Sequence, residues 1–375
     1  MIGNELEFEG LTGVGKVYLD LEPGQSVYTF IGANGVGKTK TLEALFQVLF
    51  FSNNDVLNSQ IHNAYAYGYF KFSKFIDGSF SASIKKQEHY SLWDARSLFS
   101  VNNHSLPIVY LGAQLRGVIK KNNNISPQIM GGLKNRREDY FSSVMGIMDS
   151  DFGSLGMDGS IDNWFVTIAR SSNPYQKKED NREVEIKTVI RLLHEIDNRI
   201  DPDFLEISGD DRVSLKIGDE KRELSQLSSG FSSILKLVQT IVSGYGYFTN
   251  EIQLQNVKGI VLIDEIESHL HLIWQVNIIP LLKKLFPNTT FYITTHSSVV
   301  LSQLREGEAY TLYRDQDGIV KTRKIPSPNK AALADILKDV FKVDLNQIKL
   351  ENSSIDEQQD AKKNLLDLIR KQENK

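Results

Sequence analysis

A glycine-rich segment at residues 32–39, Gly-Ala-Asn-Gly-Val-Gly-Lys-Thr, follows the pattern G-x-x-x-x-G-K-[ST] of a phosphate-binding loop. Its glycines allow backbone N–H groups to approach a polyphosphate without clashes from Cβ atoms. The ammonium of Lys38 can reach the β- and γ-phosphates, and the Thr39 hydroxyl can ligate Mg²⁺. The pattern predicts nucleotide contacts from Gly32, Ala33, Asn34, Gly35, Val36, Gly37, Lys38 and Thr39.

The residues on either side of this loop support the same interpretation. Val27–Ile31 is a short apolar run of strand-forming residues, and Lys40–Phe50 has the composition of a helix. A strand, a glycine loop and a helix N-terminus form an anion-binding arrangement, because the first helical N–H groups point at the ligand. We therefore favour a nucleotide site over an accidental match in a glycine-rich turn.

An earlier segment, Gly10–Lys16, has the same spacing of glycines and lysine. The next residue is Val17, which has no hydroxyl for a metal ion. Tyr18–Leu21 then alternates like a strand instead of opening a helix. This segment is therefore predicted to be a turn between two N-terminal strands, and a secondary role beside the base or ribose of a nucleotide stays open.

Composition excludes several classes of function. The net charge of −4 and the pI near 6.0 provide no overall basic field for nucleic acid, although a local basic groove stays open. Because the chain has no cysteine, disulfides, thiol catalysis and cysteine-zinc sites are excluded. The N-terminus lacks the regions of a signal peptide, and no apolar run approaches the ~18 residues of a membrane span. We expect a cytoplasmic protein without a membrane partner.

Alternation and turn residues outline the N-terminal part of the fold. Strands are predicted at 5–8, 16–21 and 26–31, and the helix after the loop is expected to end near Phe51. Aromatic residues alternate between 64 and 86, which predicts a hairpin with an aromatic face in the core. A platform on which nucleic-acid bases stack is the alternative for this face.

The middle of the chain is more polar. A buried strand is predicted at 105–111, and residues 117–182 are expected to contain loops and a helix at Arg137–Asp149. A helix at Glu183–Asn198 and a hairpin at Asp203–Lys216 follow. We predict that this region forms a partly helical lid or arm, since it lacks the sustained heptads of a coiled coil.

A continuous apolar run at 259–263 ends in two acids, Asp264 and Glu265. Such a run is typical of a strand buried inside a parallel sheet, and ligands bind at the carboxyl ends of such strands. Asp264 can there hold Mg²⁺ through water, and Glu265 can orient and polarise an attacking water. A strand that simply ends in solvated acids is the alternative, which the upstream phosphate loop makes less favoured.

Two further segments carry polar residues at positions suited to a phosphate. The strand predicted at 291–295 ends at His296, 32 residues after Asp264, where an imidazole can touch a γ-phosphate; a structural histidine is the alternative. Ser228, Ser229 and Gly230 precede an apolar helix that is expected to run through Val242. Small hydroxyl residues at a helix N-terminus favour an anion, although serine-rich helix caps are common.

The order of these motifs resembles the ABC-type ATPase heads of the SMC, RecF and OLD-like AAA branch. In that resemblance Leu227–Phe231 is a degenerate signature motif, Ser268–His271 is the D-loop and His296 is the H-loop. Gln114 is the candidate for the Q-loop, where it would couple Mg²⁺ and water to the lid; a surface role is the alternative. The implied fold class is α/β, a P-loop NTPase with an ABC-ATPase-like head, whose mixed sheet is flanked by helices and carries the lid or arm insertion.

The same resemblance implies the chemistry and the assembly. The cofactors are ATP and Mg²⁺. The implied catalytic residues are Glu265, His296 and Lys38, and the implied metal ligands are Thr39, Asp264 and Gln114. The signature of one subunit, Ser228–Gly230, completes the phosphate loop of another, so ATP is expected to hold a symmetric dimer together. Ser229 replaces the usual glycine of the signature motif. Its backbone can still contact a phosphate, but how closely it can approach stays open.

We divide the chain into an N-terminal ATPase half at 1–116, an insertion at 117–202, a C-terminal ATPase half at 203–325 and a helical tail at 326–375. Asp315-Gln316-Asp317-Gly318 resembles the D-x-D of a TOPRIM nuclease, but its position between two strand-like runs predicts a hairpin turn. We therefore expect an ATPase without its own nuclease. Amphipathic helices are predicted at Ala331–Phe341 and Ile355–Arg370; they would pack on the head or dock onto another protein.

With a short insertion in place of a long coiled coil, the chain resembles the ATPase subunits of bacterial anti-phage systems. Septu-type and retron-associated ATPases pair with an HNH nuclease, and PARIS-type ATPases pair with a TOPRIM effector. The resemblance implies a defence ATPase that pairs with a second copy of the same chain and holds or releases an effector. We expect this effector to be a nuclease. The alternatives are a DNA-repair or chromosome-maintenance ATPase acting directly on DNA, and a nucleotide-gated scaffold with negligible turnover.

Overall fold

The chain divides into two compact units, Met1–Asn329 and Lys330–Lys375. The computed structural model describes residues 2–59, 70–84, 98–99, 103–117, 119, 130–157, 159–344, 347–348 and 362–363. In the second unit, the helix predicted at Ala331–Phe341 is found as α11 (Leu333–Asp339). The helix predicted at Ile355–Arg370 lies, apart from residues 362–363, outside the described residues.

The first unit is built on a sheet of ten described strands in the order β5-β4-β1-β2-β13-β12-β3-β11-β10-β6. Their bounds are β1 Glu5–Leu11, β2 Gly15–Asp20, β3 Val27–Ile31, β4 Lys74–Asp77, β5 Phe80–Ser83, β6 Ile108–Leu111, β10 Gly259–Ile263, β11 Thr289–Thr294, β12 Ala309–Arg314 and β13 Val320–Lys324. Neighbouring strands from β12 through β6 are parallel, whereas β1, β2, β4 and β5 pair antiparallel. The sheet is therefore mixed, as predicted.

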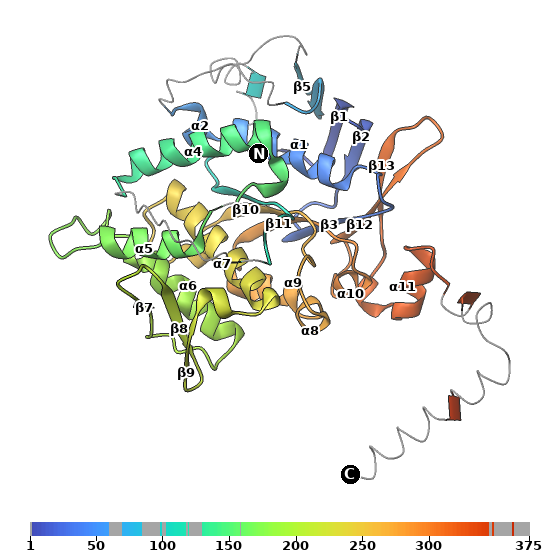
Figure 1. The fold of residues 1–375 in the computed structure, drawn as a ribbon. Coiled ribbons are helices and arrows are strands. Elements are labelled where there is room, and N and C mark those ends of the chain that lie inside the picture. The colour runs from blue at the N-terminus through green and yellow to red at the C-terminus, as the bar shows by residue number, and fades with distance from the viewer. Residues whose placement is uncertain are drawn as a thin grey trace. The chain divides into compact units, whose positions relative to one another are not determined.

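The helices of the first unit cover both faces of this sheet, with α1 above the row of strands and α7 below it in Figure 1. Their bounds are α1 Lys38–Phe51, α2 Asn54–Leu57, α4 Leu133–Ser150, α5 Ile161–Ser171, α6 Glu183–Ile196, α7 Ser229–Phe248, α8 Leu272–Gln275, α9 Ile278–Leu285 and α10 Ser298–Leu301. Because both faces are covered, every residue of β3, β6 and β10 is buried. This burial explains why these strands are continuous apolar runs in the sequence.

Helix α5 and strand β9 are among the elements that were not predicted. Helix α5 lies inside a polar segment, yet its apolar residues Ile161, Phe165 and Ile168 are buried at helical spacing, and Ser160 caps it by accepting from the Asn163 N–H at 3.3 Å. Strand β9 (Glu220–Glu223) consists of four charged residues and adds to the hairpin of β7 (Glu206–Ile207) and β8 (Val213–Ile217). An exposed edge strand needs no apolar face, so its sequence lacks the alternation from which a strand is predicted.

Helix α7 extends six residues beyond its predicted end at Val242. Its last turns contain Gly244, which lies against β6. A Cβ on Gly244 would come within 2.4 Å of a methyl group of Val109. Here glycine is required for close packing of helix on sheet, so its poor helix propensity does not end the helix.

The predicted aromatic hairpin is found as β4 and β5. Phe75 on β4 and the nearby Phe72 are buried, and each ring centroid lies 5.2 Å from that of Phe8. These rings therefore form part of the core, as expected for a packed aromatic face. The tyrosines of this segment, Tyr65, Tyr67 and Tyr69, lie outside the described residues.

His104 joins the end of α1 to the start of β6. The Leu106 N–H donates to its Nδ1 at 3.2 Å, so Nε2 carries the proton and donates to the Leu49 carbonyl at 2.8 Å. Burial lowers the pKa of this imidazole below its usual value, against the opposing effect of the bond to Leu49. The neutral ring therefore contributes stability above the unfolded-state pKa of about 6.5, and this contribution is lost as the pH falls towards the folded-state pKa.

We expect His104→Gln to reduce the pH dependence of folding. Between pH 7 and pH 5, the unfolding free energy of the wild-type chain should fall more than that of the variant, by up to about 1.4 kcal/mol per pH unit. Urea unfolding of both chains at pH 5, 6 and 7 measures the difference. Equal slopes would mean that His104 titrates alike in the folded and unfolded chains.

Candidate functional site

The carboxyl ends of four adjacent parallel strands, β3, β11, β10 and β6, bring the predicted site residues to one edge of the sheet. The loop after β3 is tightly enclosed at two glycines. A Cβ on Gly32 would lie 2.5 Å from the Leu312 carbonyl oxygen, and one on Gly37, which has φ +110°, would lie 2.8 Å from the methyls of Val14. Between these points Ala33, Asn34 and Gly35 are exposed.

Lys38 begins α1 and turns back into the loop. Its ammonium donates to the carbonyl oxygens of Gly32 at 2.9 Å and Ala33 at 3.1 Å, and the side chain is buried. Burial lowers the pKa of Lys38, against the nearby carboxylates of Glu265 and Asp264, which raise it. The cation is thus positioned inside the loop before any phosphate arrives.

The segment Gly10–Lys16 forms the turn between β1 and β2, as predicted. The ammonium of Lys16 pairs with Glu7 at 2.7 Å and with Glu9 at 3.6 Å, which does not favour a role in phosphate binding. Val14 of this turn packs against Gly37 of the phosphate loop. The segment Gly10–Lys16 therefore contacts the predicted phosphate loop and restricts its shape at Gly37.

These two lysines provide a matched pair of variants. Lys38→Ala should raise the Kd for ATP at least tenfold, because a charge-assisted hydrogen bond to phosphate contributes about 1.5–3 kcal/mol. Lys16→Ala should leave the Kd within about twofold, since its ion pairs lie at the surface. Titration with a fluorescent ATP analogue measures both. Equal effects of the two variants would contradict the assignment of the phosphate loop.

Asp264 and Thr39 meet although 225 positions separate them. The Thr39 hydroxyl donates to the two carboxylate oxygens of Asp264 at 3.0 and 3.1 Å, and the Thr294 hydroxyl donates to one of them at 2.6 Å. Burial of Asp264 raises the pKa of its carboxyl, and the two hydroxyl hydrogen bonds counter that rise. A hydroxyl and a carboxylate in contact are hard oxygen ligands, so this pair fits Mg²⁺.

Glu265 stands at the turn after β10. Its φ of +45° is unusual for a residue with a side chain, and its N–H donates to the Thr294 hydroxyl at 2.8 Å. Its carboxylate accepts from the Ser268 hydroxyl at 3.2 Å. Thr294 therefore contacts both acids, a role that sequence reasoning missed because a threonine near a strand end carries no distinctive signal.

Arg116 was also missed, and it is the most connected side chain of the site. The guanidinium is fully buried and donates to four backbone carbonyls, those of Leu111, Gly112, Asp264 and Glu265, at 3.3, 2.7, 2.8 and 2.9 Å. Burial lowers the pKa of Arg116 to about 10, which leaves it charged at neutral pH. It fastens the end of β6 to the turn that carries both acids.

Gln114 and His296 lie at the same edge of the sheet. The Gln114 N–H donates to the Gly153 carbonyl at 3.2 Å and its side chain lies over Gly153, so its amide is not hydrogen-bonded to Asp264. The His296 side chain is exposed, and its N–H donates to Glu267 at 2.5 Å. Glu267 also accepts from the Thr295 hydroxyl at 2.7 Å, so it holds the backbone beside His296 in place.

The serine-rich N-terminus of α7 lies beside the D-loop segment. Ser228 caps the helix by accepting from the Phe231 N–H at 3.3 Å, and a Cβ on Gly230 would lie 3.1 Å from the ring of His271. No hydrogen bond of Ser228, Ser229 or Gly230 within the described residues reaches the phosphate loop. Within the described residues, therefore, no hydrogen bond connects the two predicted parts of the nucleotide site.

His269 and His271 belong to the predicted D-loop segment. Among the described residues, no cluster of three or more histidine, cysteine, aspartate or glutamate side chains could hold a metal ion. The His269 ring instead packs against Gly117, where a Cβ would lie 2.4 Å from it. This contact links the D-loop segment to the loop that contains Gln114 and Arg116.

The fold and the site define a P-loop NTPase whose phosphate loop, strand-end acids and serine-capped helix occur in the order of an ABC-type ATPase head. Residues 27–302 match the family described as "AAA domain, putative AbiEii toxin, Type IV TA system", and the chain belongs to that family. None of the helices in the described part of the chain is long and apolar enough to cross a membrane.

Relatives with curated descriptions include a Septu protein and a retron ATPase. The chain is 24% identical over 358 residues to the Septu protein PtuA of Bacillus thuringiensis, covering 92% of this chain and 85% of that protein. It is 37% identical over 120 residues to the Retron Ec83 probable ATPase of Escherichia coli, covering 32% of this chain and 21% of that protein. The resemblance to anti-phage defence ATPases is thereby confirmed.

Among solved structures, the chain is similar to an Smc head bound to the C-winged helix domain of ScpA. The TM-score is 0.46 at 15% identity, and the match covers 88% of this chain and 99% of that one.

Proposed function

We propose that this chain binds ATP with Mg²⁺ and hydrolyses it. The contact between Thr39 and Asp264 supports this proposal most directly, because it joins the phosphate loop to a strand-end carboxylate. This carboxylate is buried, and its hydrogen bonds come from hydroxyl groups that carry no charge. A divalent cation would supply the missing positive charge.

The proposed mechanism assigns one role to each side chain. Lys38 and the loop N–H groups bind the β- and γ-phosphates, while Thr39 and Asp264 would hold Mg²⁺, whose charge would offset that of the phosphates. Glu265 orients a water in line with the γ-phosphate and accepts its proton, so ADP and inorganic phosphate result. His296 contacts the γ-phosphate from the exposed end of β11, and Gln114 adjusts the water and metal when its loop moves.

We further propose that two copies pair around ATP, with Ser228–Gly230 of each copy facing the phosphate loop of the other. The pairing is supported by the lack of a hydrogen bond between these two segments among the described residues of one chain. The exposed apolar surface beside them also supports it: Leu272 and Ile273 of α8 are 64% and 72% exposed, and Val276, directly after the helix, is 48% exposed. A second copy that covers α8 would remove this surface from water and form a symmetric interface.

The defence function follows from the similarity to PtuA and to the retron ATPase. We propose that the ATP-bound and ATP-free forms of the chain hold and release a separate effector, which we expect to be a nuclease, when phage infects a bacterial cell. The turn at Asp315 supports a separate effector. The Asp315 carboxylate accepts from the N–H groups of Asp317 and Ile319 and pairs with Lys321, so it stabilises a hairpin turn between β12 and β13.

Affinity purification of the tagged chain, expressed with its neighbouring genes, tests this function. We expect a nuclease-class protein to co-purify, and native mass spectrometry to find an even number of copies of this chain. Phage plating on cells with the same genes should show protection that Lys38→Ala abolishes and Lys16→Ala retains. Protection that is indifferent to Lys38→Ala would contradict the proposal. Salt-dependent DNA binding by the purified chain alone would favour an ATPase that acts directly on DNA.

A further inference from the structure

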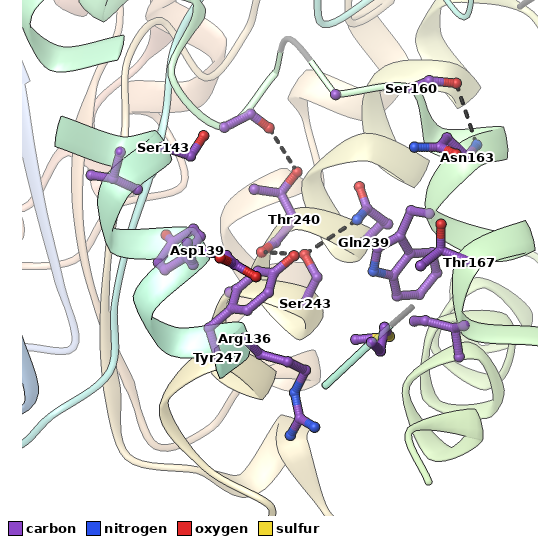
Figure 2. Close-up of a pocket in the computed structure, with 18 of the residues that line it drawn as sticks. Arg136, Asp139, Ser143, Ser160, Asn163, Thr167, Gln239, Thr240, Ser243 and Tyr247 are labelled. Carbon is purple, nitrogen blue, oxygen red and sulfur yellow. Dashed lines mark hydrogen bonds between the residues drawn. The ribbon is translucent and has the colours of Figure 1, made fainter. Parts of the chain in front are cut away.

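A cavity of about 430 Å³ lies between α4, α5 and α7, next to β6 at the end of the strand order. Its size is within the range of small-molecule sites. Polar side chains from two of these helices face one another across it, Asn163 and Thr167 from α5 and Gln239 and Ser243 from α7 (Figure 2). Neither the proposed ATP chemistry nor the proposed dimer uses this cavity.

Four residues of its wall contain a buried polar atom that has no hydrogen-bond partner within the described part of the chain. They are Tyr110 (Oη), Arg136 (Nε), Asn163 (Oδ1) and Trp164 (Nε1), of which the last two are neighbours on α5. Asn163 offers an acceptor and Trp164 a donor, and a buried polar group without a partner costs about 1–3 kcal/mol. A molecule that carries both donors and acceptors would therefore suit this wall.

The wall also contains flat apolar surface. The rings of Tyr140 and Tyr247 stack with their centroids 4.3 Å apart and their planes at 7°, and the indole of Trp164 lies on another side of the cavity. Such faces suit a planar ring, because stacking adds to the apolar area that becomes buried. The lining therefore favours a heteroaromatic molecule over an aliphatic one.

The charges at the cavity oppose an anion. Arg136 lines it, but its guanidinium donates to Gly131 at 2.9 Å and Asn250 at 2.7 Å and points away from the hydroxyl groups (Figure 2). The other charged group in the lining is the carboxylate of Asp139. With the cation engaged elsewhere and an anion present, a phosphate group would meet no partner of opposite charge.

We propose that this cavity binds an uncharged heteroaromatic molecule of nucleoside size, at a site separate from the phosphate loop. The inference goes beyond the proposed ATPase function and does not depend on it. Asn163 and Trp164 of α5 would hydrogen-bond to polar atoms of the ring, and the aromatic side chains of the wall would stack on its face.

The cavity is connected to the ATPase site through the segment Gly153–Gly156. Thr240, in the lining, donates to the Gly156 carbonyl at 3.1 Å, and a Cβ on Gly156 would lie 2.3 Å from the Tyr110 carbonyl oxygen. The same segment accepts from the Gly112 N–H at 2.9 Å and the Gln114 N–H at 3.2 Å. A molecule that shifts this segment would move the loop that holds Arg116, and so would change ATP turnover.

Calorimetric titration of the full chain with adenosine, guanosine, cytidine and uridine tests the site, with Mg²⁺ and a saturating non-hydrolysable ATP analogue present to occupy the phosphate loop. We expect at least one nucleoside to bind once per chain. Asn163→Leu and Trp164→Phe each remove one polar partner and keep the bulk, so each should weaken binding at least tenfold. Asn135→Leu, an exposed change on α4, should leave binding unaltered.

Absence of binding by all four nucleosides would overturn the proposal, as would binding that ignores both α5 variants. Tighter binding of the 5′-monophosphates than of the nucleosides would also overturn it, since the lining opposes an anion. If the α5 variants do not fold, Ser143→Trp, an exposed change that fills the cavity from α4, should abolish binding in a folded chain. Retained binding in that variant would place the ligand elsewhere.

Discussion

Glu265→Gln is expected to slow ATP turnover by about 10²–10⁴-fold while leaving the Kd for ATP within a few-fold. The amide keeps the shape of the side chain and can still contact Ser268, but it cannot accept a proton from water. Phosphate release at saturating ATP measures turnover, and titration with labelled ATP measures binding. Glu251→Gln, an exposed change outside the site, is the matched control and should leave both values unaltered.

The same variant tests the dimer. Because hydrolysis is blocked while binding remains, Glu265→Gln should accumulate as a dimer with ATP and Mg²⁺ and remain monomeric without them, as measured by light scattering after size-exclusion chromatography. A variant that binds ATP tightly and stays monomeric would refute the composite site. Unchanged turnover would refute the role of Glu265 as the base.

Arg116→Met is expected to cost about 3 kcal/mol or more of unfolding free energy and to reduce turnover by at least tenfold. Methionine fills similar space but cannot donate. The carbonyls of Leu111 and Glu265 keep the N–H groups of Asp264 and Ser268, whereas those of Gly112 and Asp264 lose the donor that the guanidinium provides, and each such loss costs about 1–3 kcal/mol. The turn that carries both acids would also be released from β6. Urea unfolding measures the first effect, and kcat below the unfolding temperature measures the second.

Arg116→Lys separates charge from geometry. An ammonium keeps the charge but cannot span four carbonyls in the plane of a guanidinium, so this variant should lie between wild type and Arg116→Met in both measurements. Wild-type stability and turnover in Arg116→Met would contradict the positioning role. A loss of stability with unchanged turnover would restrict Arg116 to a structural role.

The fold class and the phosphate loop could be predicted because their signals are local. Residues 27–50 contain a strand, a glycine loop and a helix in one uninterrupted segment, and each of these patterns predicts a single type of local structure. The acids at 264 and 265 could be added through one general rule, that parallel strands present their carboxyl ends at a common edge. Helix α5 was missed because polar residues around its apolar stripe resemble a loop.

The parts of the site that were missed depend on contacts between distant segments. Thr294 lies 30 positions from Asp264, and Arg116 lies 148 positions from it, yet both hydrogen-bond to that residue. Neither residue type is distinctive at its place in the sequence, because threonines are common in strands and arginines are common in loops. Their roles arise only when β6, β10 and β11 are placed side by side.

By itself, then, the sequence determined the glycine-loop pattern at residues 32–39 that predicts phosphate binding, the class of fold and the strand-end position of the acids, because these depend on short patterns with fixed local geometry. Only the tertiary structure decided that Arg116 fastens the acidic turn, that Val14 shapes the phosphate loop and that α5 encloses a cavity with α7. These features depend on which distant surfaces pack together, and that is settled by burial and hydrogen bonding across the whole sheet.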